Sequence, residues 1–298
     1  MTIFLTSVLD EWRLTCQEQV TPMESRSGAG VHPVRTIGGK AAYLKVTAAT
    51  SGAQAIAQAR RELRFYQDLA PITPVRTPRL LDHRDDEDGV AALLEPVGET
   101  RAAPAWTERM WADLGRELAR LHTMPLPEGA EWNRPDALEA ALADPDVDRI
   151  TAFWAPTLPG LPELLARGHE LAQDINALPP VFTHGDCHVG NLPHSAGSPA
   201  FCDWQSAGIG RPGSDLAFLG VRAATEGVSV PPALIDAYLD GRSCERRTLQ
   251  RALLAEELGV FVHLWPPFAA FNDDLGIARV RRRTLDLAER FMSHSRRP

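Results

Sequence analysis

The chain has 298 residues, of which 44% are hydrophobic and 23% are charged, a composition typical of a globular protein. Its formal net charge of −8, without a basic stripe, argues against nucleic acid as a partner. No stretch reaches the roughly 18 consecutive apolar residues of a membrane-spanning helix, so we expect no membrane association. The opening MTIFLTSVLDEW lacks the basic region of a secretory signal, and the four cysteines contain no C-x-x-C pair, which together predict a cytoplasmic protein.

The first 95 residues are expected to form β-strands around one helix. β-Branched and aromatic residues bounded by turn formers predict strands at 18–25, 31–37 and 40–46, and two more around the acidic turn within 77–99. A flexible loop, RSGAG, separates the first two strands, and a two-glycine hairpin turn separates the next two. Residues 51–71 have the composition of a helix.

A proline and a glycine shortly after residue 95 mark the expected boundary between a first lobe, 1–95, and a second lobe, 96–298. The second lobe is predicted to be mainly helical. Helices are expected at 107–124, 161–178, 214–224, 232–241, 247–265 and 279–298. Two short β-like runs are expected at 179–182 and 199–204.

Lysine is rare in this chain, and its position is informative. Of 31 basic residues only two, Lys40 and Lys45, are lysines. Lysine is a compact point charge that can contact phosphate from a strand, unlike the larger arginine fork. Lys45, on the third predicted strand, is therefore a candidate phosphate ligand.

Charge is distributed unevenly between the two predicted lobes. Residues 1–95 hold 11 basic and 12 acidic residues, whereas residues 96–298 hold 20 and 27. An acidic second lobe suits a cationic small molecule as ligand. Solvated acidic helix faces explain the same charge equally well.

The stretch VFTHGDCHVGNL, residues 181–192, allows two interpretations. As a metal site, it places His184, Asp186 and His188 at alternate positions, which share one face of a strand. Two glycines in the stretch indicate a turning loop instead, and no second His/Asp cluster with metal-ligand spacing follows. A zinc site is therefore the weaker interpretation.

As a phosphoryl-transfer loop, the same stretch has the required groups. Asp186, followed five residues later by Asn191, supplies a carboxylate for an acceptor hydroxyl and an oxygen ligand for Mg²⁺. Asp203, twelve residues further on in FCDWQ, supplies a second metal ligand. Upstream, Lys45 follows a glycine-containing loop, and Glu62, the only glutamate of the next predicted helix, is placed to pair with it. The order of these residues along the chain favours phosphoryl transfer.

The motifs also resemble those of a known family. FTHGDCHVGN resembles the H-G-D-x-x-x-x-N loop of the aminoglycoside phosphotransferases, and FCDWQSAGIGRPGSDLAFL resembles their I-D-W-x-x-A-G-x-G-D-P-x-x-D-L-A stretch. LGRELARLHTMPL resembles the helix that ends in L-H before the substrate region. The resemblance is specific over about residues 181–220. It implies an α+β, bilobal, protein-kinase-like fold, which choline kinases share, with a small β-rich N-lobe and a larger, mainly helical C-lobe.

The resemblance implies a role for each matching residue. Asp186 would be the catalytic base or the carboxylate that orients the hydroxyl, and Asn191 and Asp203 would bind Mg²⁺. Lys45 would contact the α- and β-phosphates of ATP, with GTP as an alternative, and Glu62 would hold Lys45 in place.

Further matching residues would support the loop and the nucleotide. His184 would brace the loop, and Asp215 would hydrogen-bond to it from the start of a helix. Residues 25–30 would cover the phosphates, and residues 95–97 would form the hinge against adenine. The individual nucleotide contacts expected there are Ser27, Gly28, Gly30, Glu95 and Val97.

The sequence departs from the family pattern at two places. Where the family has G-D-P this chain has GRP, and Arg211 flanks the acceptor side. We expect Arg211 to face solvent, the alternative being that it alters the shape of the acceptor site. Asp186 is followed by Cys187 and His188, and we assign no function to His188.

The resemblance implies an antibiotic acceptor, and the acidic second lobe favours a cationic one, such as an aminoglycoside or a tuberactinomycin-type peptide, bound by a monomer or weak dimer. The candidate acidic ligands are Asp273, Asp274, Glu256 and Glu257, with exposed helix-end acids as the alternative explanation. Trp265, Phe268 and Phe271 are candidates for a flat pocket, or for the core.

Other functions stay open at this stage. The alternative acceptors are a macrolide and a metabolite of the choline or sugar type. A zinc-dependent hydrolase and a nucleotide-binding module without transfer activity are the alternatives outside the kinase class.

Overall fold

The structure is a computed structural model and describes residues 2–17, 23–24, 30–195 and 197–294 of the chain. Within these ranges no helix combines the length and the apolar character that crossing a membrane requires.

The described chain forms two compact units. The first consists of Met1–Glu99 and Pro193–Ala207, and the second of Thr100–Leu192 and Gly208–Pro298. The prediction from sequence assigned everything after residue 95 to the second lobe, whereas residues 193–207 pack in the first unit.

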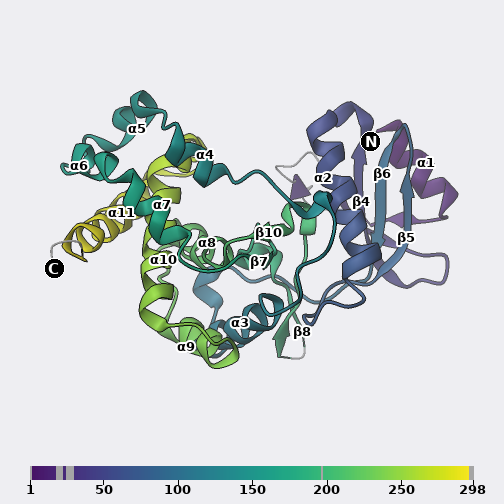
Figure 1. The fold of residues 1–298 in the computed structure, drawn as a ribbon. Helices are drawn as coiled ribbons and strands as arrows, with labels where there is room; N and C mark the ends of the chain where they lie inside the picture. The colour runs from purple at the N-terminus through teal and green to yellow at the C-terminus, as the bar shows by residue number, and fades with distance from the viewer. Residues whose placement is uncertain (1, 18–22, 25–29, 196, 295–298) are drawn as a thin grey trace. The chain divides into compact units, whose positions relative to one another are not determined.

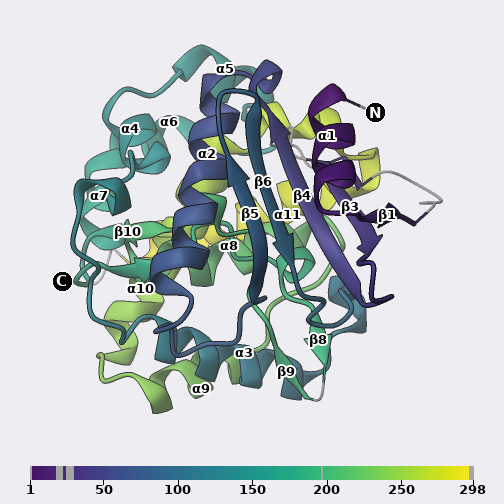
Figure 2. The same ribbon diagram turned by 90° about the vertical axis from the view of Figure 1, so that its right-hand side faces the viewer.

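An antiparallel sheet forms the centre of the first unit (Figures 1 and 2). Its strand order is β1-β3-β4-β6-β5, with β2 paired to β3. The strands are β1 (Thr15–Cys16), β2 (Met23–Glu24), β3 (Gly30–Arg35), β4 (Ala41–Ala48), β5 (Leu80–Asp85) and β6 (Gly89–Leu94). The strands predicted at 31–37, 40–46 and within 77–99 are confirmed. The strand predicted at 18–25 and the loop before β3 fall mostly outside the described residues.

The alternation of side chains along β4 separates two faces of this sheet. Leu44 and Val46 are buried against α1 (Ile3–Glu11), a helix that the sequence pattern did not predict. Lys45 lies between them and so points to the other face. That face packs against α2 (Ala53–Arg64), and Figure 2 shows α1 and α2 on opposite sides of the strands. The sheet thus carries its lysine on the side covered by α2.

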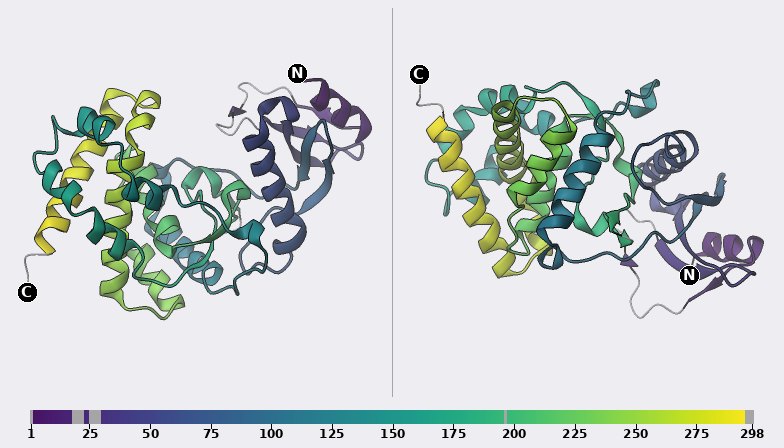
Figure 3. Two further views of the ribbon diagram at one scale, coloured as in Figure 1. Left: turned by 45° about the horizontal axis from the view of Figure 1, so that its top comes forward. Right: turned by 90° about the horizontal axis from the view of Figure 1, so that it is seen from below.

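The second unit is mainly helical (Figure 3). Its helices are α3 (Glu108–Leu121), α4 (Ala137–Ala143), α5 (Val147–Trp154), α6 (Leu161–Ala166), α7 (Gly168–Ile175), α8 (Pro212–Ala224), α9 (Pro232–Gly241), α10 (Arg246–Gly259) and α11 (Asp274–His294). Two short strands, β7 (Val181–Thr183) and β10 (Gly208–Gly210), pair antiparallel. The predicted combination of a small β-rich first lobe and a larger, mainly helical second lobe is confirmed.

Two local predictions for the later part of the chain were wrong. The helix expected at 161–178 is two helices, because the backbone of Arg167 leaves the helical region before the flexible Gly168. The β-like run expected at 199–204 is not a strand beyond β9 (Ser198–Pro199). Asp203 adopts φ 67° in that segment, a left-handed conformation that ends extended structure.

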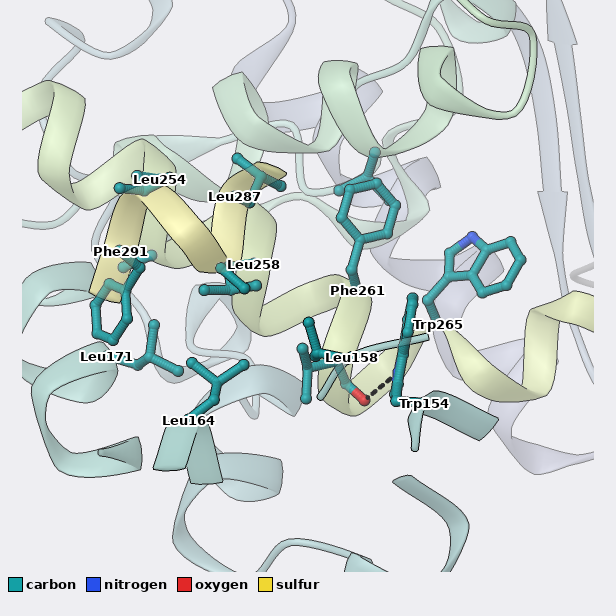
Figure 4. Close-up of a cluster of buried hydrophobic side chains, with 14 of the residues drawn as sticks. Trp154, Leu158, Leu164, Leu171, Leu254, Leu258, Phe261, Trp265, Leu287 and Phe291 are labelled. Carbon is teal, nitrogen blue, oxygen red and sulfur yellow. Dashed lines mark hydrogen bonds between the residues drawn. The ribbon is translucent and has the colours of Figure 1, made fainter. Parts of the chain in front are cut away.

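A large cluster of buried apolar side chains lies in the second unit (Figure 4). It joins α5, α10 and α11, and includes Trp154, Leu258 and Phe291. The indole Nε1 of Trp154 donates a hydrogen bond of 3.2 Å to the carbonyl oxygen of Val262, in the π-helical turn Val260–Leu264 that continues α10. A buried tryptophan therefore satisfies its only polar group within the core.

Close packing of α3 against α9 predicts a stability effect at Gly115. A Cβ atom at this position would overlap the carbonyl oxygen of Leu234, which belongs to the backbone and cannot move aside cheaply. We expect Gly115→Ala to lower the free energy of unfolding by about 2 kcal/mol or more.

The matched control is Gly168→Ala at the start of α7, where a Cβ atom meets nothing within 4 Å. This substitution should leave stability unchanged or raise it by up to about 1 kcal/mol. Urea unfolding of both variants tests the pair, and equal effects would contradict the packing argument.

Candidate active site

Lys45 is held between two carboxylates in the first unit. Its Nζ lies 2.5 Å from Oε2 of Glu62 on α2 and 2.6 Å from Oδ1 of Asp203. Burial alone would lower the pKa of Lys45, but the charges and hydrogen bonds of both acids raise that pKa well above its usual range. The side chain is therefore a permanent cation, fixed in position on β4.

The segment that carries Asp203 is anchored to the first unit by packing. The Trp204 ring stacks on Phe65 with ring centroids 3.8 Å apart and planes 11° apart, and both side chains are fully buried. The backbone N–H of Phe201 donates to the carbonyl of Arg76. These contacts hold Asp203 in its left-handed conformation, an arrangement that is uncommon outside glycine and that recurs at functional sites.

The loop with the H-G-D motif follows β7 in the second unit. Nδ2 of Asn191 donates to both the backbone oxygen and Oδ2 of Asp186, at 3.0 and 3.1 Å. The imidazole Nδ1 of His188 accepts from the backbone N–H of Gly190, which caps the short 3-10 turn Val189–Asn191. Because the Asn191 amide group donates to Asp186, its Oδ1 points away from that carboxylate.

Asp186 is an ionised carboxylate in this loop. Burial raises its pKa, but His188, whose Nε2 lies 3.7 Å from Oδ2, and the charges of His184 and Arg222 lower the pKa to below the usual value. A carboxylate of this kind orients a hydroxyl by accepting its hydrogen bond, and is a weak proton acceptor at neutral pH.

Asp215, on the first turn of α8, holds the start of the loop. Its two carboxylate oxygens accept hydrogen bonds of 2.8 Å from the backbone N–H groups of His184 and Gly185. Gly185 has φ 80°, a conformation that favours glycine and turns its N–H toward Asp215. These are contacts of the kind that the family resemblance implied for Asp215. His184 in turn accepts from the Asp186 N–H through Nδ1.

The sequence did not assign a role to His122, which completes this network. Its Nε2 lies 3.2 Å from Oδ2 of Asp215, and its Nδ1 lies 3.0 Å from the hydroxyl oxygen of Tyr238. All three side chains are buried. The L-H ending of the α3 sequence pointed to this histidine. Its partner, Asp215, lies 93 residues later, and nothing in the sequence indicated that the two side chains meet.

The geometry does not support the zinc interpretation. Within the described ranges no three His, Cys, Asp or Glu side chains are arranged to hold a metal ion. Nδ1 of His184 and Nδ1 of His188 each accept a backbone N–H instead. Burial raises the pKa of the Cys187 thiol well above its usual value, which disfavours the thiolate form.

The structure describes some of the residues that we expect to contact the nucleotide. Gly30 begins β3, opposite Val46, whereas Ser27 and Gly28 lie outside the described residues. Glu95 donates its backbone N–H to the carbonyl of Arg79 and its carboxylate pairs with that side chain. Val97 is buried. The hinge and glycine-loop roles of these residues stay predictions.

Arg211 does not face solvent, so that prediction was wrong. The side chain is 7% exposed, and its Nε and Nη2 lie 2.9 and 2.8 Å from the two oxygens of Glu256. Its Nη1 lies 2.6 Å from Oδ2 of Asp136, which also caps α4. Burial lowers the pKa of Arg211, but these two acids more than reverse the effect and raise it. The carboxylate of Glu256 is thereby committed to an internal ion pair.

The other predicted acceptor residues divide into paired and exposed ones. Glu257 is buried and paired with Arg283, with both N–O distances at 2.8 Å. Asp273 and Asp274 are exposed at the start of α11, where Asp273 accepts from the backbone N–H of Gly276. Trp265 belongs to the core, whereas Phe268 and Phe271 are 43% and 67% exposed.

The Arg211 ion pair predicts non-additive mutational effects. Arg211→Met leaves the Glu256 carboxylate buried without its partner, so we expect a loss of about 3–5 kcal/mol in unfolding free energy. The double variant Arg211→Met/Glu256→Met should recover much of this loss, because the most deeply buried unpaired charge, that of Glu256, is removed, while Asp136 is partly exposed and still caps α4. Urea unfolding of the single and double variants tests this. A double variant as unstable as the sum of the two single ones would contradict it.

Asp215 predicts a pH-dependent stability effect. Burial raises its pKa, but the hydrogen bonds and charges of His122, His184 and Gly185 hold the pKa below the ordinary value of about 3.9. A carboxyl group whose pKa is lower in the folded than in the unfolded protein stabilises the fold at every pH above its unfolded-state pKa. This stabilisation is lost as the pH falls through the pKa of the folded state. We expect Asp215→Asn to cost about 2–4 kcal/mol at pH 7 and less at pH 3.

Urea unfolding of the wild-type and variant proteins across this pH range is the measurement. Asp240→Asn, an exposed position on α9, is the control and should change stability by less than about 0.5 kcal/mol. A penalty for Asp215→Asn that grows toward acid pH would refute the assignment.

Several solved structures share the fold of this chain at low sequence identity. A search of curated proteins found no significant match. Among solved structures, a microcompartment-associated aminopropanol kinase is 15% identical, with a TM-score of 0.70 and 98% of each chain covered. A macrolide 2′-phosphotransferase type I is 19% identical (TM-score 0.61; 95% of this chain and 98% of that chain covered). An amicoumacin kinase in complex with AMP-PNP, Ca²⁺ and Ami is 15% identical (TM-score 0.58; 94% and 93% covered).

These likenesses confirm the predicted kinase-like fold. The phosphotransferase enzyme family model matches residues 34–253, a range that includes Lys45, Asp186 and Asp203. The chain therefore belongs to the phosphotransferase enzyme family.

Proposed function

We propose that the protein transfers the γ-phosphoryl group of ATP to a hydroxyl of a small cationic molecule. The observation that carries the proposal is the Asp186 carboxylate, ionised and held by Asn191 in a loop that Asp215 fixes. A positioned carboxylate of this kind is what phosphoryl transfer requires on the acceptor side.

The residues present suit ATP with Mg²⁺. Asp203 and Asn191 offer carboxylate and amide oxygens, the hard ligands that Mg²⁺ prefers, and no thiolate or imidazole competes in this set. The fixed cation of Lys45 would bind phosphate oxygens, with Glu62 keeping it in place. When bound, Mg²⁺ would neutralise part of the negative charge on the phosphates. An amicoumacin kinase of the same fold is described in complex with a nucleotide analogue and a divalent cation.

Asp186 acts on the acceptor by orientation more than by early proton removal. Its lowered pKa makes it a poor base for a free alcohol. In a loose transition state the attacking oxygen needs little activation, and its proton leaves late, to the carboxylate that already accepts its hydrogen bond. Most of the rate enhancement assigned to Asp186 is therefore positioning.

A cationic acceptor is supported by charge and by one exposed segment. The second predicted lobe holds 27 acidic against 20 basic residues. Phe268 and Phe271 are exposed shortly before Asp273 and Asp274, which combines aromatic faces with carboxylates. Such surfaces suit ammonium groups. We propose an antibiotic of the aminoglycoside or tuberactinomycin type as the acceptor.

Asp186→Asn tests the catalytic assignment. We expect kcat to fall by at least about 100-fold, because the amide cannot accept the hydroxyl proton. The Kd for ATP should stay within about threefold of the wild-type value, because the proposed phosphate ligand, Lys45, is unchanged. Asp240→Asn makes the same chemical change on an exposed face and should leave kcat unaffected. A kcat for Asp186→Asn equal to that of the wild-type protein would contradict the proposed role of Asp186.

The acceptor is identified by incubating the protein with Mg²⁺ and ATP against hydroxyl-bearing antibiotics and small amino alcohols. A mass gain of one phosphate on one compound, absent with Asp186→Asn, identifies the acceptor class. Modification of a neutral macrolide, with none of the amines modified, would refute the cationic acceptor. ATP binding without transfer to any compound would contradict the proposed acceptor classes and favour a metabolite outside the panel.

A further inference from the structure

The second unit contains a recess that the phosphoryl-transfer site does not use. A cavity of about 790 Å³ is lined by residues of α8, α9, α10 and α11 and of the turn between α8 and α9. Figure 3 shows these helices together. Its lining includes neither Asp186 nor Asn191. The volume lies within the range of about 300–1,000 Å³ that small-molecule sites occupy.

The charge of this recess is opposite to that of the chain. Seven arginines line it, against three acidic residues, in a protein whose formal net charge is −8. The arginines come from α10 and α11 and lie next to apolar residues such as Leu216 and Ile235 from α8 and α9. A recess with low-dielectric walls and one sign of charge concentrates ions of the other sign.

Four of the seven arginines are neutralised by carboxylates. The best defined is Arg283, which forms a two-point ion pair with the buried Glu257. Both residues of this pair line the recess, and Arg283 compensates the charge of Glu257.

The other three arginines lack such compensation. Arg247, Arg279 and Arg282 have no carboxylate within 4.0 Å in the described part of the chain. Arg279 donates to the backbone carbonyl of Thr225 at 3.0 Å, and Arg247 and Arg282 are exposed. Three guanidinium groups without an ion pair around one recess favour an anion there. Guanidinium groups bind phosphate and carboxylate oxygens in pairs of hydrogen bonds.

We propose that this arginine recess binds a small molecule that carries at least two anionic oxygen groups, phosphate or carboxylate, on a carbon skeleton. The site is separate from that of the proposed cationic acceptor and does not depend on that proposal. Arg247 and Arg282 make the ionic contacts, and the apolar residues of α8 and α9 pack against the remainder of the ligand.

Isothermal titration calorimetry at constant ionic strength tests the site, with inorganic pyrophosphate and citrate as separate probes. The variant Arg247→Gln/Arg282→Gln removes two of the free cations from exposed positions and should fold normally. The matched control is Arg109→Gln/Arg149→Gln, which makes the same charge change at two exposed arginines outside the recess.

Saturable binding of either probe to the wild-type protein supports the proposal if its affinity falls at least tenfold in the recess variant and less than threefold in the control. The probe that binds then identifies the anionic group, phosphate or carboxylate. Three results would overturn the proposal: no binding of either probe, equal weakening in both variants, or unchanged affinity in the recess variant. The last result would place the anion at another site, such as the nucleotide phosphate ligands.

Discussion

The ion pairs of Lys45 with Glu62 and Asp203 organise the first unit. They join a strand, a helix and a segment that lies 158 residues further along the chain. Burying three charged groups is costly, and it is tolerated here because the ammonium group is shared by both acids at short distance. Removal of Lys45 would leave two carboxylates without the cation that compensates them, whereas removal of either acid would leave a single ion pair. The position of the Lys45 ammonium group is thus tied to the integrity of the whole unit.

A second buried carboxylate has the same function in the other unit. Asp215 accepts hydrogen bonds from two consecutive backbone amides of the motif loop and from His122. The loop therefore derives its shape from α8 and α3, both of which are packed in the helical core. Asp186 and Asn191 contact each other on this loop. The supporting groups are buried, and the groups that we propose to act on the substrates lie on the loop that they support.

The sequence was sufficient for the parts of the site that follow from local pattern. The rarity of lysine and the order Lys45, Glu62, Asp186, Asn191, Asp203 along the chain were enough to nominate these groups, and the H-G-D motif indicated the family. Ion pairs between residues far apart in the chain could not be predicted from the sequence. Arg211 was expected to face solvent because its partners, Asp136 and Glu256, lie 75 and 45 residues away and only packing brings them together. The helix α1 was missed because nine residues give too short a periodic signal.

The first unit is built from two separate stretches of chain, and this has a consequence for its biosynthesis. Residues up to Glu99 leave the ribosome well before Pro193–Ala207 does. At translation rates of about 5–20 residues per second, the delay is roughly 5–20 seconds. During that interval Lys45 and Glu62 have no Asp203, and Phe65 lacks the ring that covers it. The nascent lobe therefore waits with an apolar surface exposed, which makes it a natural target for chaperones while the rest of the chain is synthesised.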